Sequence, residues 1–137
     1  MSATRDCTFC AIAARVAPAD RVYEDDATFA IMDIHPQAPG HVLVIPKRHA
    51  AQIYDLDDAG AAELARALVR VARGIRAALS PEGLSVRQAN GRAAGQDVMH
   101  VHVHLIPRGV AGEPTGRTPG ERAAIAARIR AAIETAG

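Results

Sequence analysis

The sequence predicts an α+β fold, in which a single domain is built on an antiparallel five-stranded sheet with one long helix, a short N-terminal helix and a C-terminal helix. The chain has 137 residues, the length of one ordinary domain. Its apolar segments are short and are separated by turn residues, as in hairpins, and one long helical pattern interrupts them. Hairpin-linked strands with a single helical crossover are typical of an antiparallel sheet with helices packed on it.

The first half of the chain supplies a short helix and three strands. Residues 8–15 predict the N-terminal amphipathic helix. Residues 22–24 and 28–33 read as two strands of a hairpin, because an acidic turn separates them. Residues 34–40 contain two prolines and a glycine, which cannot continue a ladder, so a loop is expected there. Residues 41–45 then form the third strand.

The second half supplies the long helix, two more strands and the last helix. Asp57 can cap a helix that runs to Leu79, and residues 84–88 and 98–107 predict the fourth and fifth strands. Residues 123–133 predict the C-terminal helix. We expect one domain over residues 1–137, with a core at 7–108 and an extension at 109–137. The apolar stripe of the long helix is expected at Leu64, Leu68, Val71, Ile75 and Leu79.

Composition narrows the class of function. Hydrophobic residues make up 49% of the chain and charged residues 23%, which is typical of a folded globular domain. The net charge is only +1 and aromatics are 3%, so neither a nucleic-acid footprint nor a base-stacking platform is expected. No apolar run approaches the ~20 residues that cross a bilayer, and residues 1–6 lack the apolar stretch of a secretory leader. We therefore expect a cytoplasmic protein without a membrane partner.

Three histidines, His100, His102 and His104, alternate with apolar residues. In a strand they share one face at a spacing of about 6.6 Å, while the residues between them face the core. Three imidazoles this close repel one another when all are protonated, so some are expected to be neutral at pH 7, and a neutral imidazole is a nucleophile, a base or a metal ligand. Two alternatives stay open at this point: the histidines could simply cover an exposed strand face, or they could hold one metal ion where the strand bends.

The sequence His-Val-His-Val-His-Leu-Ile at residues 100–106, followed by Pro-Arg, resembles the signature of the histidine triad (HIT) family. Segments at residues 23–26, 32–34, 39–49 and 90–96 are similar to the same family, so the likeness covers most of the chain. The resemblance implies nucleotidyl transfer. His102 would attack the α-phosphorus of a nucleoside phosphate derivative, and water would then hydrolyse the nucleotidyl-histidine intermediate.

The resemblance also assigns supporting roles. His104 and His41 would donate to phosphate oxygens, His100 would complete the catalytic cluster, and the second nitrogen of His102 would have to donate to a carbonyl or carboxylate. Asp33 would bind ribose hydroxyls, and backbone N–H groups of a glycine-containing loop would face the phosphate. The nucleotide contacts implied in this way are Asp33, Asn90, Gly95, Gln96, Asp97, Val98 and His104. Candidates for the apolar slot around the base are Phe9, Ile12, Ile31 and Ile34, each of which could equally be a core residue.

Two positions depart from the family pattern. Asp97 stands where many relatives carry Ser or Thr, and its carboxylate would repel a phosphate unless it points away. Ala89 stands where Asn or Gln is frequent, although Asn90 is adjacent. Both departures affect the expected geometry of phosphate binding and leave the nucleophile unchanged.

Cys7 and Cys10 have the spacing CxxC. A disulfide is not expected in a cytoplasmic chain, and the βαβ context of a redox site is absent. Zinc needs four ligands, and the resemblance supplies two more, since prokaryotic relatives pair such cysteines with the equivalents of His49 and His100. The resemblance therefore implies a structural zinc ion at Cys7, Cys10, His49 and His100. The alternative is that the cysteines are small buried residues of the first helix.

The expected function is hydrolysis of nucleoside phosphate derivatives, such as dinucleoside polyphosphates or phosphoramidates. The alternatives are a nucleotidyltransferase, a nucleotide-binding module without turnover, and a metal-storage or sensor site. The intact middle histidine argues against the module without turnover. The resemblance further implies a homodimer in which the long helix and an edge strand face their counterparts.

Overall fold

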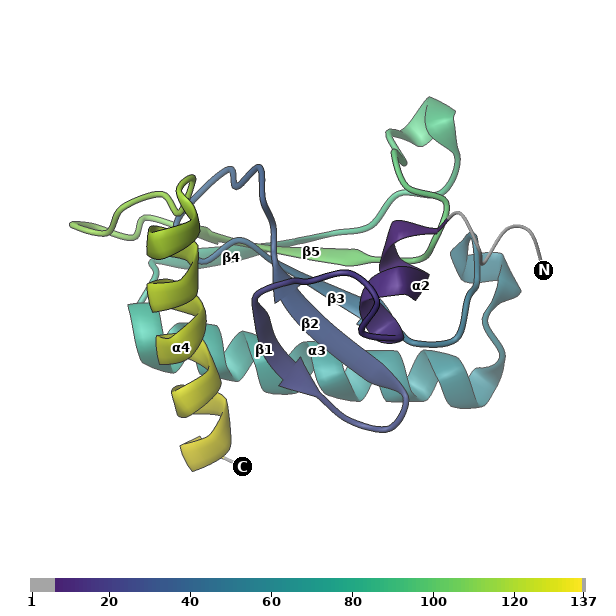
Figure 1. Cartoon of the computed structure of the whole chain (residues 1–137), viewed down its shortest axis with the longest axis horizontal. Helices are drawn as coiled ribbons and strands as arrows, with labels where there is room; N and C mark the ends of the chain where they lie inside the picture. The colour runs from purple at the N-terminus through teal and green to yellow at the C-terminus, as the bar shows by residue number, and fades with distance from the viewer. Residues whose placement is uncertain (1–6, 137) are drawn as a thin grey trace.

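The structure is a computed structural model that describes residues 7–136. The expectation about a secretory leader concerns residues 1–6, which lie outside the described residues. Five strands form one antiparallel sheet, as predicted, and the structure gives their order in the sheet as β1-β2-β3-β5-β4 (Figure 1). No helix in the described range is long and apolar enough to cross a membrane. The strands are β1 (Arg21–Glu24), β2 (Thr28–Met32), β3 (Val42–Pro46), β4 (Gly83–Arg87) and β5 (Val103–Arg108). The helices are α2 (Thr8–Ala13), α3 (Asp58–Leu79) and α4 (Pro119–Ala136), with 3₁₀ turns η1 (Ile53–Asp55) and η2 (Arg92–Ala94).

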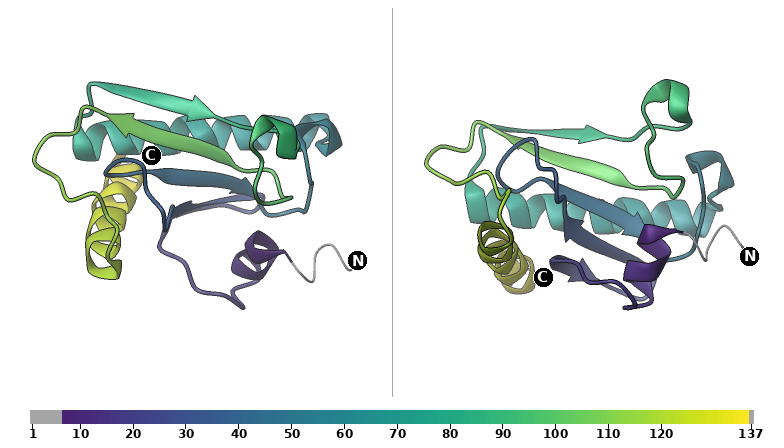
Figure 2. Two further views of the ribbon diagram at one scale, coloured as in Figure 1. Left: turned by 90° about the horizontal axis from the view of Figure 1, so that it is seen from above. Right: turned by 45° about the horizontal axis from the view of Figure 1, so that its top comes forward.

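The sheet has a different layer on each face. The long helix α3 and the C-terminal helix α4 cover one face, and the short helix α2 lies on the other (Figure 2). Alternation along the strands explains this arrangement, since side chains two apart face the same way. In β2, for example, Ala30 and Met32 join the cluster under α3 and α4, whereas Phe29 and Ile31 join the cluster under α2.

The long helix begins and ends where its sequence indicates. The Asp57 side chain accepts a hydrogen bond from the Gly60 N–H at 2.7 Å, which caps the first turn. Ser80 ends the helix in the left-handed conformation, with φ at 48°. The predicted stripe faces the sheet: four of its residues are buried, and Leu68 is partly buried against them. The C-terminal helix is longer than predicted and adds Ile125, Ala126 and Ile129 to the same core.

The fifth strand is shorter than the sequence predicts. It begins at Val103 rather than at residue 98, so His100 and His102 lie in an extended segment that precedes the strand. Continuing the register of β3 with β5 would set Pro46 opposite Val101, and proline has no N–H for a ladder. The Val101 N–H instead donates to the Ala50 carbonyl at 2.8 Å. The three histidines therefore do not form one regular row on a strand, which corrects that prediction.

Candidate active site and metal centre

The ends of β2, β3 and β5 bring four ionisable side chains together on the α2 face of the sheet. The register sets Leu43 opposite His104, so His41 lies diagonally beside His104 on the same face. Nε2 of His41 is 2.9 Å from Nδ1 of His104 and 3.3 Å from Oδ2 of Asp33. The rings of His102 and His104 follow at a centroid distance of 5.2 Å.

The backbone determines which nitrogen of His102 carries the proton. Nδ1 of His102 lies 2.8 Å from the carbonyl oxygen of His100. A carbonyl can only accept, so Nδ1 is the donor and Nε2 of the neutral ring keeps its lone pair. The structure therefore contains the carbonyl partner that a nucleophilic histidine was expected to need. His102 is 6% exposed, and its imidazole lies against the Phe9 ring.

A second backbone group determines which nitrogen of His41 carries the proton and, through His41, which nitrogen of His104 does. The Gln37 N–H donates to Nδ1 of His41 at 3.0 Å, so the proton of the neutral His41 ring is on Nε2. This N–H points at Nδ1 of His104, which must then be the acceptor. The proton of neutral His104 is consequently on its Nε2, where it is free to donate to another group.

Burial favours the neutral form of the His41 and His104 rings. Removal from water lowers the pKa of His41 to about 4, against an opposing effect of the Asp33 carboxylate. Burial also lowers the pKa of His104, and the neighbouring His102 adds to this effect. Neutral histidines were expected from mutual repulsion, and the structure shows that desolvation is the larger cause.

The loop at residues 90–98 uses most of its polar groups to hold its own shape. The buried Gln96 amide donates to the carbonyls of Ala51 and Val98, at 2.6 and 3.0 Å, and accepts from the Gly91 N–H. Both of its N–H groups are thus used, which corrects the expectation that this side chain is turned to the phosphate. The backbone N–H groups of Gly95 and Gln96 are also bonded, to the carbonyls of Arg92 and Gly91.

The two backbone donors at the end of this loop, which lead into the histidine segment, stay free. The N–H groups of Asp97 and Val98 make no hydrogen bond to any residue between 7 and 136. Asn90 contributes structurally, since its side-chain oxygen accepts from the Ile53 N–H and its side-chain amide pairs with that of Gln88. The N–H groups of Asp97 and Val98 are therefore available to an anion beside the histidines.

The Asp97 side chain lies beside His102 instead of pointing away from it. Its Oδ1 is 3.6 Å from Nε2 of His102, and its side chain is 81% exposed. A carboxylate at this distance repels an approaching anion and attracts a cation. Any substrate phosphate must displace this side chain or approach from its far side.

Three of the four apolar candidates are core residues. Phe9, Ile12 and Ile31 are buried in the cluster under α2. Phe9 also packs edge-on against the rings of His100 and His102, so it positions the histidine segment. Ile34, in contrast, is 61% exposed, and it is the one candidate with surface to offer a ligand.

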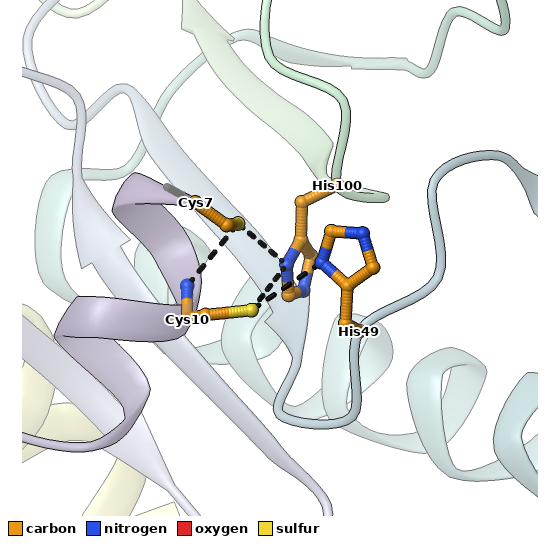
Figure 3. Close-up of side chains that lie close together, drawn as sticks. All are labelled: Cys7, Cys10, His49 and His100. Carbon is orange, nitrogen blue, oxygen red and sulfur yellow. Dashed lines mark hydrogen bonds between the residues drawn. The ribbon is translucent and has the colours of Figure 1, made fainter. Parts of the chain in front are cut away.

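The four predicted metal ligands meet between α2, the loop after β3 and the segment before β5 (Figure 3). Their ligand atoms all lie within 4.8 Å of one another. Nδ1 of His100 is 3.2 Å from Sγ of Cys7 and 3.5 Å from Sγ of Cys10, which is 3.3 Å from Nδ1 of His49.

The chemistry of these donors fits zinc. Nε2 of His100 donates to the Pro46 carbonyl at 2.8 Å, so Nδ1 has its lone pair directed at the two sulfurs. Burial and the adjacent Cys7 raise the pKa of the Cys10 thiol to about 11, an effect that a divalent cation would reverse. Two thiols and two such imidazoles make a closed tetrahedral set.

A second group of side chains has a similar spacing but does not fit a metal. The ligand atoms of Asp33, His41 and His104 also lie within 4.8 Å of one another. Because the Gln37 N–H occupies Nδ1 of His41, the nitrogen that faces the group carries a proton and has no lone pair for an ion. This arrangement supports a hydrogen-bond chain from His41 to His104.

The groups that fix the protonation states were not found from the sequence. The Gln37 N–H and the carbonyls of Pro46 and His100 are backbone atoms, and no side-chain pattern marks them. The contact of Asp33 with His41 was also missed, since Asp33 was assigned to the ribose alone. His35 is exposed in the loop between β2 and β3.

The fold and the histidine cluster together define a protein of the histidine triad class. The family comparison agrees: the HIT domain matches residues 14–110, and the chain belongs to this family. The chain is 40% identical over 116 residues to "Protein hit" of Bacillus subtilis, covering 85% of this chain and 80% of that protein. It is also 40% identical over 102 residues to the adenosine 5′-monophosphoramidase hnt1 of Schizosaccharomyces pombe, covering 74% of each. A zinc-bound histidine triad family protein from Mycobacterium smegmatis superposes with a TM-score of 0.86 at 36% identity, covering 97% of this chain and 96% of the other.

Proposed function

We propose that this protein hydrolyses nucleoside monophosphate derivatives, phosphoramidates first among them, through a nucleotidyl intermediate on His102. The observation that carries the proposal is the hydrogen bond from Nδ1 of His102 to the His100 carbonyl, which leaves Nε2 as a nucleophile. The fission yeast relative named as a monophosphoramidase supports the choice of substrate.

The reaction follows from the assigned protons. Nε2 of His102 attacks the α-phosphorus, a P–N bond forms, and the bond to the leaving group breaks with its electron pair. The leaving group takes up one proton from solvent. Water then attacks the same phosphorus, the P–N bond to His102 breaks with its electron pair returning to Nε2, and the water releases one proton to solvent. The products are the nucleoside monophosphate and the protonated leaving group. Nε2–H of His104, oriented by His41, donates to the phosphate oxygens as charge develops on them.

The free N–H groups of Asp97 and Val98 are proposed to bind the same phosphate, with Gly95 allowing the loop to turn at φ 98°. Asp33 is proposed to reach the ribose, while Asn90 and Gln96 hold the loop. His100 acts on the reaction indirectly, because its carbonyl orients His102.

We further propose that Cys7, Cys10, His49 and His100 hold a structural zinc ion. The ion would neutralise two thiolates and fix α2 to the histidine segment. The similarity to the zinc-bound histidine triad protein of Mycobacterium smegmatis supports this proposal. We also propose a cytoplasmic location, because both cysteines are free thiols and would have to stay reduced to bind zinc.

We also propose a homodimer that joins two sheets through β4. Within the described sheet β4 has a strand on one side only, whereas α4 packs over the other edge strand, β1. Val86 on β4 and Val69 on α3 are 56% and 47% exposed, which gives this edge an apolar surface.

Steady-state turnover of an adenosine phosphoramidate tests the catalytic proposal. His102→Ala should lower kcat/KM at least ~10⁴-fold, as expected for a covalent nucleophile. The ring is buried, so His102→Gln is a second variant that keeps more of the packing, and thermal melting checks the fold of both. His35→Ala, an exposed histidine in a loop, should keep wild-type activity. Residual turnover above about a tenth of wild type in a folded His102 variant would exclude His102 as the nucleophile, and nucleotide transfer to added phosphate would make the protein a transferase.

A further inference from the structure

A cleft of about 720 Å³ lies on the face of the sheet opposite the histidine cluster, between β1, α3 and α4. In Figure 1, α4 and β1 lie side by side and α3 runs behind them. Its volume falls within the range of small-molecule sites. Its lining consists of five arginines, two glutamates, a tyrosine and two aliphatic residues: Arg15, Arg21, Arg70, Arg73, Arg130, Glu24, Glu134, Tyr23, Val22 and Ile133.

One of the two carboxylates is already engaged at the rim. Glu24 forms ion pairs with Arg15, Arg21 and Lys47, the last at 2.7 Å. The Lys47 ammonium group and the two guanidinium groups hold the pKa of Glu24 below its usual value. Glu24 therefore cannot neutralise the arginines on the helices as well.

The cleft arginines that lie on α3 and α4 have uncharged hydrogen-bond partners or none. Arg70 donates to the Tyr23 hydroxyl at 3.3 Å, and Arg130 donates to the Arg21 carbonyl at 2.6 Å. Arg73, one turn after Arg70 on α3, makes no hydrogen bond or ion pair with residues 7–136. Neutral partners orient a guanidinium group without cancelling its charge, so the cleft keeps an excess of positive charge.

Arg21, in contrast, directs its guanidinium group to the α2 side of the sheet. There it donates to the Ile12 carbonyl and lies over the Phe29 ring, 5.3 Å from the ring centroid. The guanidinium groups available to a ligand in the cleft are therefore those of the helix arginines. Planar guanidinium groups bind phosphate oxygens in a bidentate manner.

We propose that this cleft binds a small anion with at least two linked phosphoryl groups. Arg70 and Arg73 on α3 and Arg130 on α4 would contact the ligand, and several guanidinium groups on two helices favour an anion with more than one phosphoryl group. The charge is confined to one bounded cleft on a chain of net charge +1, which favours a compact anion over a nucleic acid. The site is separate from the histidine cluster, and the proposal does not depend on the proposed hydrolysis.

Calorimetric titration with inorganic pyrophosphate at low salt tests the proposal. Arg70→Gln/Arg73→Gln should weaken pyrophosphate binding at least 10-fold. The matched control, Arg66→Gln, removes an exposed arginine from the same helix that does not line the cleft, and it should bind within about 2-fold of wild type. His104→Ala should also bind as wild type, which separates this cleft from any phosphate site at the histidines. The double arginine variant should keep wild-type turnover and melting temperature.

Three results would overturn the proposal. The first is that wild type does not bind pyrophosphate. The second is that Arg66→Gln weakens pyrophosphate binding as much as the double variant does. The third is that the double variant binds pyrophosphate with the affinity of wild type. A single phosphate that binds as tightly as pyrophosphate would remove the requirement for linked phosphoryl groups. If the double variant does not fold, Arg130→Gln on α4 gives the same comparison.

Discussion

At the level of single residues, the chemistry of the cluster depends on which imidazole nitrogen carries its proton. The Gln37 N–H and the His100 carbonyl decide this for His41 and His102, and His104 follows from His41. Removing a histidine therefore also changes the hydrogen-bond role of its neighbour. A double substitution of His41 and His104 should cost less than the sum of the two single effects on kcat/KM.

The buried His41 makes the stability of the protein depend on pH. Its folded pKa is about 4, below the 6.5 of an exposed histidine, so the unfolded chain binds the extra proton first as the pH falls. The contribution of His41 to the free energy of unfolding is present above about pH 6.5, and about 3 kcal/mol of it is lost between pH 7 and pH 4. The groups that act on His41 are Asp33, which opposes the shift, and His104, Arg87 and Arg108, which favour it.

Urea unfolding measured from pH 4 to 7.5 checks this prediction. The free energy of unfolding should fall less steeply with acid in His41→Gln than in wild type, because the variant has no group to protonate at that position. Parallel curves for the two proteins would show that His41 does not carry this dependence.

Side-chain identities could be predicted from the sequence at this scale, and protonation states could not. The alternation at residues 100–104 marks the histidines, and CxxC marks the cysteines. The tautomers depend on backbone carbonyl and N–H groups, which every residue has, so no sequence pattern distinguishes them. Gln96 was misassigned for a related reason, since its partners, the Ala51 and Val98 carbonyls, are also backbone groups.

At the level of elements, the four proposed zinc ligands come from parts of the chain that share little other structure. They join α2 to the loop after β3 and to the segment before β5. The α2 helix has only six residues, too short to be stable by itself, so its position depends on this connection and on the packing of Phe9 and Ile12. The bound ion is thus expected to contribute to folding and not to chemistry.

Zinc removal checks this expectation. Chelation or Cys10→Ser should reduce bound zinc and lower the melting temperature by roughly 10 °C, while folded molecules keep most of their turnover. His49→Asn should behave like Cys10→Ser, and the matched control His35→Asn should keep its zinc. Protein purified from zinc-containing medium with no zinc by elemental analysis would remove the site. Immediate loss of turnover without a change in melting temperature would make the metal catalytic.

The boundaries of elements show what periodicity can and cannot predict. The long helix was predicted within a residue, because its cap and its stripe are both written in the sequence. The fifth strand was predicted to begin five residues too early, because alternation continues through Val101 although the pairing with β3 stops before Pro46. An extended segment that pairs with no neighbouring strand can have the same alternating sequence as a strand.

At the level of the whole molecule, the two edges of the sheet differ. The edge strand β1 packs against α4, whereas Val86 on β4 is exposed to solvent, as is Val69 on α3. The division into a core at 7–108 and an extension stays a prediction, and the buried side chains of α4 lie in the main core. An uncovered edge strand next to an exposed apolar helix surface favours pairing with a second copy.

Sedimentation at micromolar concentration checks the dimer. Wild type should sediment with twice the 14.4 kDa mass of the chain, and Val86→Glu should sediment as a monomer. Val16→Glu, which changes an even more exposed valine after α2, should stay dimeric. A wild-type monomer, or a dimer unaffected by Val86→Glu, would contradict the proposed interface.

The most direct test of the catalytic proposal is to trap the nucleotide on the protein. Wild type mixed with an adenosine phosphoramidate labelled at the α-phosphate and quenched in alkali within a single turnover should carry the label on residue 102. A phosphorus–nitrogen bond to imidazole should survive the alkali and release the nucleoside monophosphate in acid, and His102→Ala should carry no label. Rapid turnover without label on residue 102, or label on another residue at the same rate, would contradict the nucleophilic role of His102.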